Sequence, residues 1–402
     1  MRVLVAHNFY RSNAPSGENQ LVKAEVALLR EGGVEAVEMF EDSDSIPGGP
    51  RGVLRAAPGP IYSPSGVRRF KRLLDSVQPD VVHLHQVTPL ISPAVVRVAG
   101  TYGVPVVQTV HNYRHGCANG LHLRDGHVCT DCVGSRLGLP ALEHGCYRGS
   151  RLQTVPVTIG MTVHRRTWRQ GVARYLALTP FMRDMLVSYG LPADRITVRP
   201  TWVPDPGSAG EPGRDVLYVG RLDEAKGIDR LLDAWALARR GGLHPQQRLV
   251  IAGDGPLRNL VTAALDVDPM ITWLGQVSPD RVAQAMADAA YVVVPSRVFE
   301  GYPLAVAEAF GRGRAVLTVS GGSVGSIIDD ETGWVVDPSA EGLAQALASI
   351  TAEDARSRGA AARTSYEQHN TPAAGLASLL AVYDAVSGLG GEGSRTVRSD
   401  YG

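Results

Sequence analysis

The chain has 402 residues, a formal net charge of zero and 20% charged residues, so it is long enough for two domains and ordinary in composition for a globular protein. It shows no signal-peptide pattern and no apolar run long enough to span a bilayer, so we expect a cytoplasmic protein. Residues 1–205 hold 23 Lys and Arg against 16 Asp and Glu, and the remainder 17 against 24. This balance argues against a general nucleic-acid binder, but it allows an anionic acceptor or peripheral contact with an anionic membrane.

Strand patterns alternate with helical patterns along the chain, which predicts a doubly wound α/β architecture. A segment rich in Pro and Gly at 204–213 separates two series of strands. We predict two Rossmann-like domains, 1–205 and 206–370, followed by an apolar helix at 371–388 and a tail at 389–402. The strands are expected at 2–6, 34–39, 81–84, 106–110, 175–178 and 196–198, and then at 216–219, 249–252, 271–274, 291–294, 315–319 and 334–336.

Three loops of the first half follow predicted strands, where open α/β sheets bind their ligands. Gly17 lies between the first strand and a predicted helix, and His85 follows the third strand. His111 ends the strand 106–110. We take His111 as a site candidate and His85, in the same position one strand earlier, as a second candidate. The alternatives are a glycine that serves only turn geometry and a histidine that only caps its loop.

All four cysteines fall in the polar loop 111–150, in the spacing C-x11-C-x2-C-x13-C. Four thiolates can bind a tetrahedral zinc, and a metal can fold a loop that has little core of its own. We predict a structural zinc site, with one or two disulfides and free thiols as the alternatives. His115, His127 or His144 could replace one thiolate. The predicted ligands are Cys117, Cys129, Cys132 and Cys146.

The first loop of the second half joins the strand 216–219 to a helical pattern and carries Arg221 and Lys226. The chain has only three lysines against 37 arginines, yet this position holds Lys. A compact ammonium on a flexible stem differs from a planar guanidinium in a tight phosphate pocket. The alternative is a solvated lysine at the start of a helix.

Two carboxylates, Glu300 and Glu308, flank a Gly-Tyr-Pro-Leu turn that follows the buried strand 291–294. Proline suits the first turn of a helix, so a helix is predicted to begin beside Glu300 and to carry Glu308 more than one turn inside. The free N–H groups of such a helix can bind an anion. This loop can therefore offer a carboxylate, a row of amides and a second carboxylate to a phosphorylated ligand.

The second half contains, in order, Gly-Arg…Lys-Gly, Gly-Asp-Gly-Pro, Leu-Gly-Gln-Val and Glu-x7-Glu, between Gly220 and Glu308. This series resembles that of retaining glycosyltransferases with the GT-B fold, in particular glycosyltransferase family 4. The resemblance implies two Rossmann-like domains that face each other across a cleft, with the last helix crossing back to the first domain. It also implies retaining transfer of a sugar from a nucleotide-diphosphate donor to a small-molecule, glycan or lipid-linked acceptor.

The resemblance assigns roles to the candidate residues. Arg221 and Lys226 would neutralise the leaving diphosphate, so that no catalytic divalent metal is required. Glu300 would lie by the donor sugar, and His111 would face that sugar from the first domain. Three further groups would bind the rest of the donor. They are the backbone of Gly17 and of the turn Gly301, Tyr302, Pro303 and Leu304, the base-contacting backbone at Gly275 and Val277, and Glu308 at the ribose.

Two alternatives to transfer remain at the level of sequence. A sugar-nucleotide epimerase shares the GT-B architecture and would convert a free nucleotide sugar without an acceptor. A non-catalytic binding protein would keep the fold and bind donors without turnover. The full set of Arg221, Lys226, Glu300 and Glu308 argues against the second alternative.

Overall fold

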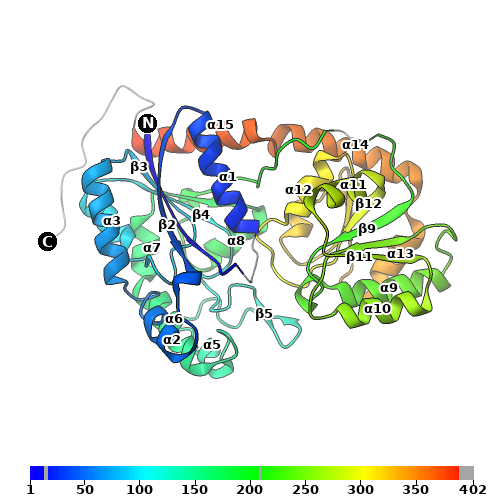
Figure 1. Cartoon of the computed structure of the whole chain (residues 1–402), viewed down its shortest axis with the longest axis horizontal. Helices are drawn as coiled ribbons and strands as arrows, with labels where there is room; N and C mark the ends of the chain where they lie inside the picture. Colours follow the sequence, from blue (N-terminus) through cyan, green and yellow to red (C-terminus); the bar gives the residue numbers. More distant parts are fainter. Residues whose placement is uncertain (13–16, 208–209, 389–402) are drawn as a thin grey trace.

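The computed structural model describes residues 1–12, 17–207 and 210–388, and the predicted tail at 389–402 lies outside them. The described chain forms two lobes (Figure 1), each built on a six-stranded parallel sheet. The first sheet contains β1 (Arg2–Phe9), β2 (Glu35–Asp42), β3 (Val81–Leu84), β4 (Val106–Val110), β7 (Arg174–Ala177) and β8 (Ile196–Val198). The second contains β9 (Asp215–Val219), β10 (Leu249–Ala252), β11 (Ile271–Gly275), β12 (Ala289–Val294), β13 (Ala315–Val319) and β14 (Gly333–Val336).

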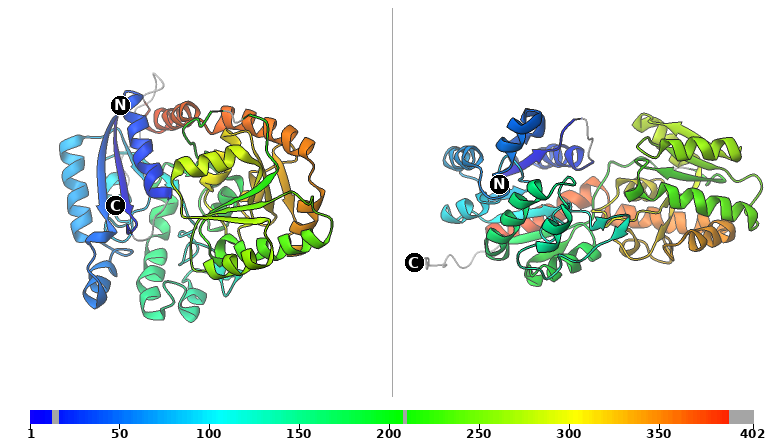
Figure 2. Two further views of the ribbon diagram at one scale, coloured as in Figure 1. Left: turned by 45° about the vertical axis from the view of Figure 1, so that its right-hand side comes forward. Right: turned by 90° about the horizontal axis from the view of Figure 1, so that it is seen from below.

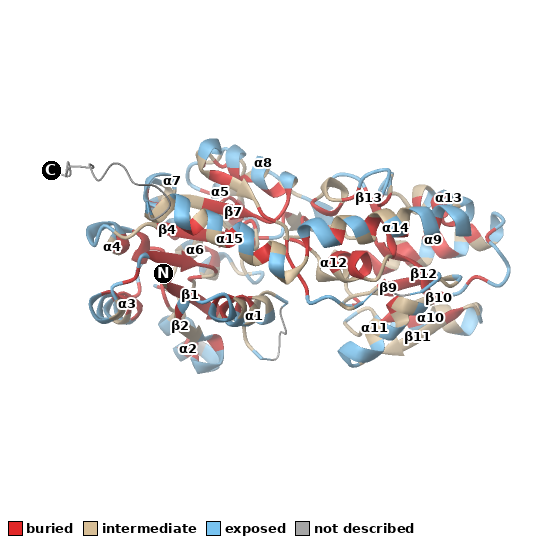
Figure 3. Cartoon of the chain, turned by 90° about the horizontal axis from the view of Figure 1, so that it is seen from above, coloured by how far each residue is buried: buried red, intermediate tan, exposed pale blue. Residues whose placement is uncertain are grey.

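Every strand predicted from the sequence is present, and the doubly wound α/β class is confirmed. The central strands β4, β12 and β13 are buried on both faces because helices cover both sides of each sheet (Figure 3), which is why they are rich in Val and carry no charged residue. A short hairpin, β5 (Leu123–Arg124) with β6 (His127–Val128), was not predicted. Strands this short leave no periodic pattern in a sequence.

Several helices begin at a Ser-Pro or Thr-Pro pair. The hydroxyl accepts a hydrogen bond from a free backbone N–H of the first turn, and the proline occupies a position that needs no N–H. The helices of the first lobe are α1 (Gly17–Glu31), α2 (Gly49–Ala56), α3 (Pro64–Val77), α4 (Val95–Thr101), α5 (Leu139–His144), α6 (Arg151–Val163), α7 (Arg165–Gly171) and α8 (Pro180–Ser188). Those that follow are α9 (Ile228–Arg240), α10 (Arg258–Val267), α11 (Pro279–Asp288), α12 (Leu304–Gly311), α13 (Ala340–Ser349), α14 (Ala352–His369) and α15 (Pro372–Ser387).

The strand orders determine where each sheet offers a crevice. The orders are β2-β1-β3-β4-β7-β8 and β11-β10-β9-β12-β13-β14. The direction of winding reverses between β1 and β3 in the first sheet and between β9 and β12 in the second. Ligands of open α/β sheets bind at the carboxyl ends of the strands at such switch points. The two lobes lie side by side in Figure 2.

The last helix returns to the first lobe. In Figure 1, α15 runs from α14 back towards the N-terminus, and it contacts α1 and β3. Its Tyr383 is buried, and its hydroxyl lies 2.7 Å from Nδ1 of His83. The chain therefore crosses between the lobes twice, once between β8 and β9 and once between α14 and α15. No helix in the described part of the chain is both long and apolar enough to cross a membrane.

Candidate functional site

The loops after β9 and β12 flank the switch point of the second sheet and are joined to each other. The backbone N–H of Arg297 donates to the carbonyl oxygen of Ala225 (2.9 Å). Gly227 follows with φ 72°, and a Cβ there would lie 2.1 Å from the carbonyl oxygen of Pro295. Only glycine permits both that conformation and that approach. The packing of the two loops therefore fixes where Lys226, the residue before this glycine, emerges.

Lys226 and Glu300 form a close ion pair at this switch point. Nζ of Lys226 lies 2.6 Å from Oε1 and 2.7 Å from Oε2 of Glu300. The Ser296 hydroxyl also donates to Oε1 (2.6 Å). Asp223 caps the short helix Glu224–Lys226 by accepting from the Lys226 amide (3.0 Å). Side chains 74 positions apart in the sequence are thereby brought into direct contact.

The other residues predicted on this domain lie at the same edge of the sheet but not in this pair. Arg221 is 64% exposed, and its Nε lies 3.2 Å from Oδ2 of Asp223 in its own loop. Gly275 ends β11 with φ 68°, and its carbonyl oxygen accepts from the Gly253 amide (2.8 Å). Val277 lies two residues further and is partly exposed. Arg221 and Gly275 therefore border the crevice from separate strands.

The turn after Glu300 leads into α12, whose N-cap residue is Pro303. Pro303 has no N–H, so the amides available to an anion are those of Gly301, Tyr302 and Leu304. The Tyr302 side chain is buried, and its hydroxyl accepts from Nδ2 of Asn370 (3.1 Å). Burial raises the pKa of Tyr302 to about 12. Tyr302 can therefore serve a ligand through its backbone only.

Glu308 lies on α12, one turn beyond the start of the helix. Its side chain is largely enclosed, and burial raises the pKa of its carboxyl above the usual range. An enclosed carboxylate is costly unless something compensates its charge or donates hydrogen bonds to it. Pairs of ligand hydroxyls are suitable partners for such a group.

The two lobes approach each other closely at two of the predicted glycines. A Cβ on Gly301 would lie 2.5 Å from the carbonyl oxygen of His111, at the end of β4. A Cβ on Gly17 would lie 3.0 Å from Cδ1 of Leu304, at the start of α12. The structure thus places His111 and Gly17 of the first lobe against the loop that carries Glu300.

Hydrogen bonds and aromatic rings hold the same loop. The hydroxyls of Tyr113 and Ser323 both donate to the carbonyl oxygen of Glu300, at 3.0 and 2.5 Å. The Phe299 ring packs against those of Phe181 and Tyr113, with centroids 4.5 and 5.8 Å apart. Glu300 is therefore positioned by residues of both lobes.

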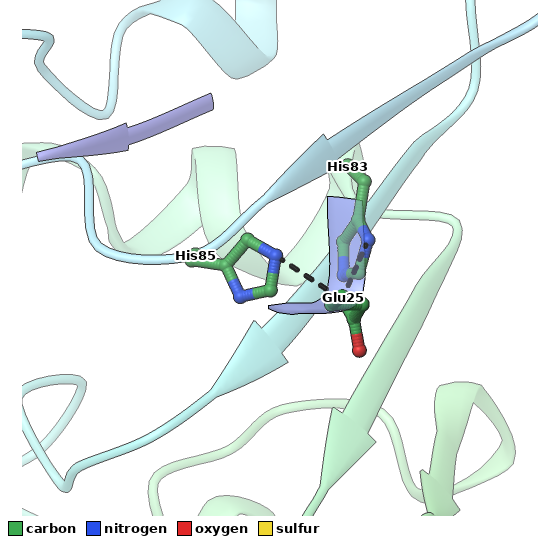
Figure 4. Close-up of side chains that lie close together, drawn as sticks. All are labelled: Glu25, His83 and His85. Atoms are coloured by element: carbon green, nitrogen blue, oxygen red, sulfur yellow. Dashed lines mark ion pairs between the residues drawn. The ribbon is translucent and has the colours of Figure 1, made fainter. Parts of the chain in front are cut away.

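His111 lies at the end of a buried row of polar side chains. Its Nε2 is 2.9 Å from Nδ1 of His85, and Nε2 of His85 is 3.4 Å from Oε1 of Glu25 (Figure 4). Arg199 pairs with the other oxygen of Glu25 (2.8 Å). Burial, together with the neighbouring His85, lowers the pKa of His111 well below its usual value. His111 is therefore neutral near pH 7.

Glu25 and Arg199 are not among the residues predicted from the sequence. Glu25 occupies a position on the apolar stripe of α1, among the buried residues Val22, Val26 and Leu29. A carboxylate on the buried face of a helix is the signal that identifies it, because such a group needs a partner inside the fold. The sequence gives no comparable signal for Arg199, because its partner lies 174 residues away.

The four cysteines form no disulfide with one another and lie in the loop that leads from β4 to α6. Burial and the neighbouring Cys117 raise the thiol pKa of Cys132 to about 11. Within the described ranges, only Glu25, His83 and His85 bring three potential metal-ligand atoms within 4.8 Å of one another. The cysteines thus suit zinc by number and type, but their sulfurs do not form a compact tetrahedral set.

The hairpin within the Cys-rich loop reaches the second lobe. A Cβ on Gly126, at the turn of the hairpin, would lie 2.5 Å from Oε1 of Glu224, in the loop that carries Lys226. At the base of the hairpin, the backbone N–H of Cys129 donates to the carbonyl oxygen of His122 (2.8 Å), and the His122 ring lies 5.2 Å from that of Phe299. The Cys-rich loop therefore contacts both loops of the second switch point.

A cavity of about 970 Å³ opens at the carboxyl ends of β1, β3 and β4. Tyr10, Gln86 and Asn112 contribute a polar group, in which the two amides donate to the Tyr10 hydroxyl at 3.3 Å each. His111 and Arg114 also line the cavity, as do apolar side chains of α2 and α6. The size and mixed lining suit an organic ligand that carries polar groups.

Two family models match the chain, one to each lobe. Residues 20–205 match "Glycosyltransferase Family 4", and residues 213–353 match "Glycosyl transferases group 1". A phosphatidyl-myo-inositol mannosyltransferase of Mycolicibacterium smegmatis is 32% identical over 44% of this chain and 47% of that protein. The gpi3 subunit of a phosphatidylinositol N-acetylglucosaminyltransferase of Schizosaccharomyces pombe is 28% identical over 37% of this chain and 32% of that protein. The alignments thus span about half or less of the length of these relatives.

Solved structures share the fold over almost the whole chain. Anabaena HepE in complex with UDP superposes with a TM-score of 0.66 and 14% identity, covering 96% of this chain and 100% of that one. A sucrose-phosphate synthase of Thermosynechococcus elongatus gives 0.65 and 19%, covering 96% and 99%. The two sheets, the facing lobes and the returning last helix are the GT-B architecture. With one family model on each lobe, this chain belongs to glycosyltransferase family 4.

Proposed function

We propose that the protein is a retaining glycosyltransferase that uses a nucleotide-diphosphate sugar. The pair of Lys226 and Glu300 at the second switch point, facing His111 across the interface, is the observation that carries this proposal. It combines a cation for a diphosphate with a carboxylate for sugar hydroxyls, beside the free amides at the start of α12. The reacting carbon of a bound donor would lie between the two lobes.

The ion pair is suited to hold both groups in place until a donor arrives. In our proposal Lys226 turns from Glu300 to the diphosphate, and Glu300 then accepts hydrogen bonds from the sugar. Arg221, which is exposed and 3.2 Å from Asp223, would close over the same phosphates. Two cations stabilise the charge that develops on the leaving diphosphate, so the reaction needs no catalytic divalent metal. Glu308 would hold the ribose, and Gly275 and Val277 the base.

The first lobe would supply the acceptor site and His111. The cavity of about 970 Å³ would bind a small-molecule, glycan or lipid-linked acceptor with its hydroxyl towards the donor. Several relatives are named for mannosyl transfer to phosphatidylinositol lipids, and a structural neighbour was solved with UDP-glucose. The first donors to test are therefore GDP-mannose and UDP-glucose. The relatives compared with this chain are named as transferases, so we propose transfer rather than epimerisation. We also propose that the protein acts in the cytoplasm.

We also propose that Cys117, Cys129, Cys132 and Cys146 bind one structural zinc. Thiolates are suitable ligands, and the loop that carries them has little regular structure beyond the hairpin β5–β6 and α5. The metal would have no part in the chemistry. Its effect would be to fix the hairpin against Glu224 and the Phe299 ring.

Replacing Lys226 tests the proposed function. We expect Lys226→Ala to cost about 2–4 kcal/mol of transition-state stabilisation, because a charge-assisted contact to the leaving group is lost. This corresponds to a fall in kcat/KM of roughly 30- to 1000-fold. Lys71→Ala, at an exposed position on α3, is the matched control and should transfer at the wild-type rate. Near wild-type turnover of Lys226→Ala with saturating donor and acceptor would refute the placement of the diphosphate.

A further inference from the structure

The cluster of Glu25, His83 and His85 has the composition of a metal site, but its hydrogen bonds suit another role. Oε2 of Glu25 already pairs with the buried Arg199 (2.8 Å). Both nitrogens of His83 are also occupied, by the hydroxyls of Tyr383 (2.7 Å) and Thr109 (2.8 Å). A cation here would lie beside a guanidinium and would have to displace two hydrogen bonds. The cluster therefore lacks a third free ligand for a metal.

His85 is the one member of the cluster that leads out to the proposed site. Its Nε2 faces Oε1 of Glu25 at 3.4 Å, and neither atom has another hydrogen-bond partner among the described residues. Its Nδ1 lies 2.9 Å from Nε2 of His111. His111 borders the cavity, and Nδ1 is the ring nitrogen that it has left for a ligand. Glu25, His85 and His111 thus form a line from the core to the cavity.

The direction of each hydrogen bond in this line follows from the charge of Glu25. Burial alone would raise the pKa of this carboxyl, but Arg199 and the two imidazoles outweigh burial and hold the pKa well below its usual range. Ionised Glu25 can only accept, so His85 must donate from Nε2. Arg199 already balances the charge of Glu25, so a second cation at His85 would go uncompensated among buried neutral rings. Neutral His85 then accepts at Nδ1.

We propose that Glu25 acts through His85 as a positioning residue, fixing His111 as the Nε2–H tautomer with its Nδ1 lone pair facing the sugar site. His111 must then donate from Nε2 to His85, so Nδ1 accepts a hydrogen bond from a hydroxyl of the donor sugar or of the acceptor. The relay extends the proposed function, since its effect on transfer rests on His111 facing the donor. No proton needs to be transferred between Glu25, His85 and His111.

The tautomer of His111 can be measured in the donor-free protein. We expect two-dimensional NMR of protein with ¹⁵N-labelled histidine, with His111 assigned from a His111→Gln variant, to show Nε2 protonated and Nδ1 unprotonated. A protonated Nδ1 on His111, or an imidazolium at His85, would overturn the relay. This measurement requires neither a substrate nor a folded variant at Glu25.

Glu25→Gln should reverse the relay. Arg199 can only donate, so the amide oxygen must face Arg199, and the amide NH2 then faces His85. His85 would accept at Nε2 and donate from Nδ1, which forces His111 into the Nδ1–H tautomer. We expect this reversal, with a fall in kcat of about tenfold or more. Tyr383→Phe, which removes a hydroxyl from the same cluster but not from the relay, is the matched control and should keep the wild-type tautomer.

The outcomes separate the relay from the proposed function. An unchanged His111 tautomer in folded Glu25→Gln would overturn the relay. A reversed tautomer with wild-type kcat would overturn the positioning role while leaving glycosyl transfer intact. Absence of transfer by the wild type would count against the proposed function, whereas the tautomers would still be measurable.

Discussion

At the scale of single residues, the candidate site consists of charged groups that already lie close together before a ligand binds. Lys226 and Glu300 lie 2.6 Å apart, and the Glu300 side chain is only 11% exposed. Its backbone carbonyl is held by Tyr113 and Ser323. Such preorganisation lowers the cost of arranging dipoles around a developing charge. Glu308 differs, because burial raises its pKa. Its ionised form is therefore poorly solvated until a ligand binds.

The Glu308→Gln variant should therefore separate stability from donor binding. A raised folded-state pKa gives stability that is present below the unfolded pKa and is lost as pH rises through the folded pKa. Ionised Glu308 thus disfavours the fold at pH 8, and neutral Gln should match or exceed the wild-type Tm there. Donor affinity should fall about tenfold, since hydrogen bonds to a charged acceptor are lost.

Calorimetry at pH 8 and titration with the donor measure the two effects. Glu341→Gln, which changes an exposed carboxylate on α13, is the control for both. A Tm below wild type at pH 8 would contradict the stability argument. Unchanged donor affinity would contradict the assignment of Glu308 to the ribose.

At the scale of elements, the Cys-rich loop is a connector between the lobes. Its hairpin touches Glu224 beside the Lys226 loop, and His122 at its base lies 5.2 Å from Phe299 beside Glu300. The loop contains several residues with positive φ, including His122 at 51° and Asp125 at 50°. A backbone with so many irregular conformations needs a strong local constraint. We propose that zinc provides this constraint.

Elemental analysis of protein purified without added metal should find about one zinc per chain. Cys132→Ser should lose the metal, lower the Tm and reduce transfer, because the hairpin would no longer support Phe299. Ser135→Ala in the same loop is the control and should keep its zinc. Absence of zinc together with four titratable thiols in the native protein would refute the site.

At the scale of the whole molecule, the lobes are joined by two chain crossings and meet through close glycine contacts. Gly301 brings the Glu300 loop against the carbonyl oxygen of His111, and Gly17 brings α1 against Leu304. Interfaces between domains of one chain are usually able to move. The lobes are in contact in the described conformation. We propose that this closure completes the site and excludes water from a bound donor.

Gly301→Ala should prevent this closure. Its Cβ would lie 2.5 Å from a backbone oxygen, which cannot move aside as a flexible side chain would. We expect a larger radius of gyration by solution scattering in the presence of nucleoside diphosphate, and a fall in kcat/KM of about 100-fold. Gly322→Ala, where the nearest atoms lie at 3.8 Å, is the matched control. Wild-type transfer by Gly301→Ala would show that this contact is not needed for the reaction.

The sequence by itself determined the fold class, the strands and the family, because these depend on local patterns. Runs such as that of β12 predict buried strands. Gly-Arg…Lys-Gly lies within a single loop, and Glu-x7-Glu spans one loop and the first turns of the next helix. The sequence also identified Lys226 and Glu300 as candidates, but not that they form an ion pair.

Only the tertiary structure decided which candidates meet. The strand order places the loops after β9 and β12 side by side, and packing between the lobes puts His111 against Gly301. It also turned the Tyr302 side chain inward and connected Glu25 to Arg199 across 174 positions. These contacts depend on strand order, on close backbone approach and on the burial of charge, none of which is a property of a short stretch of sequence.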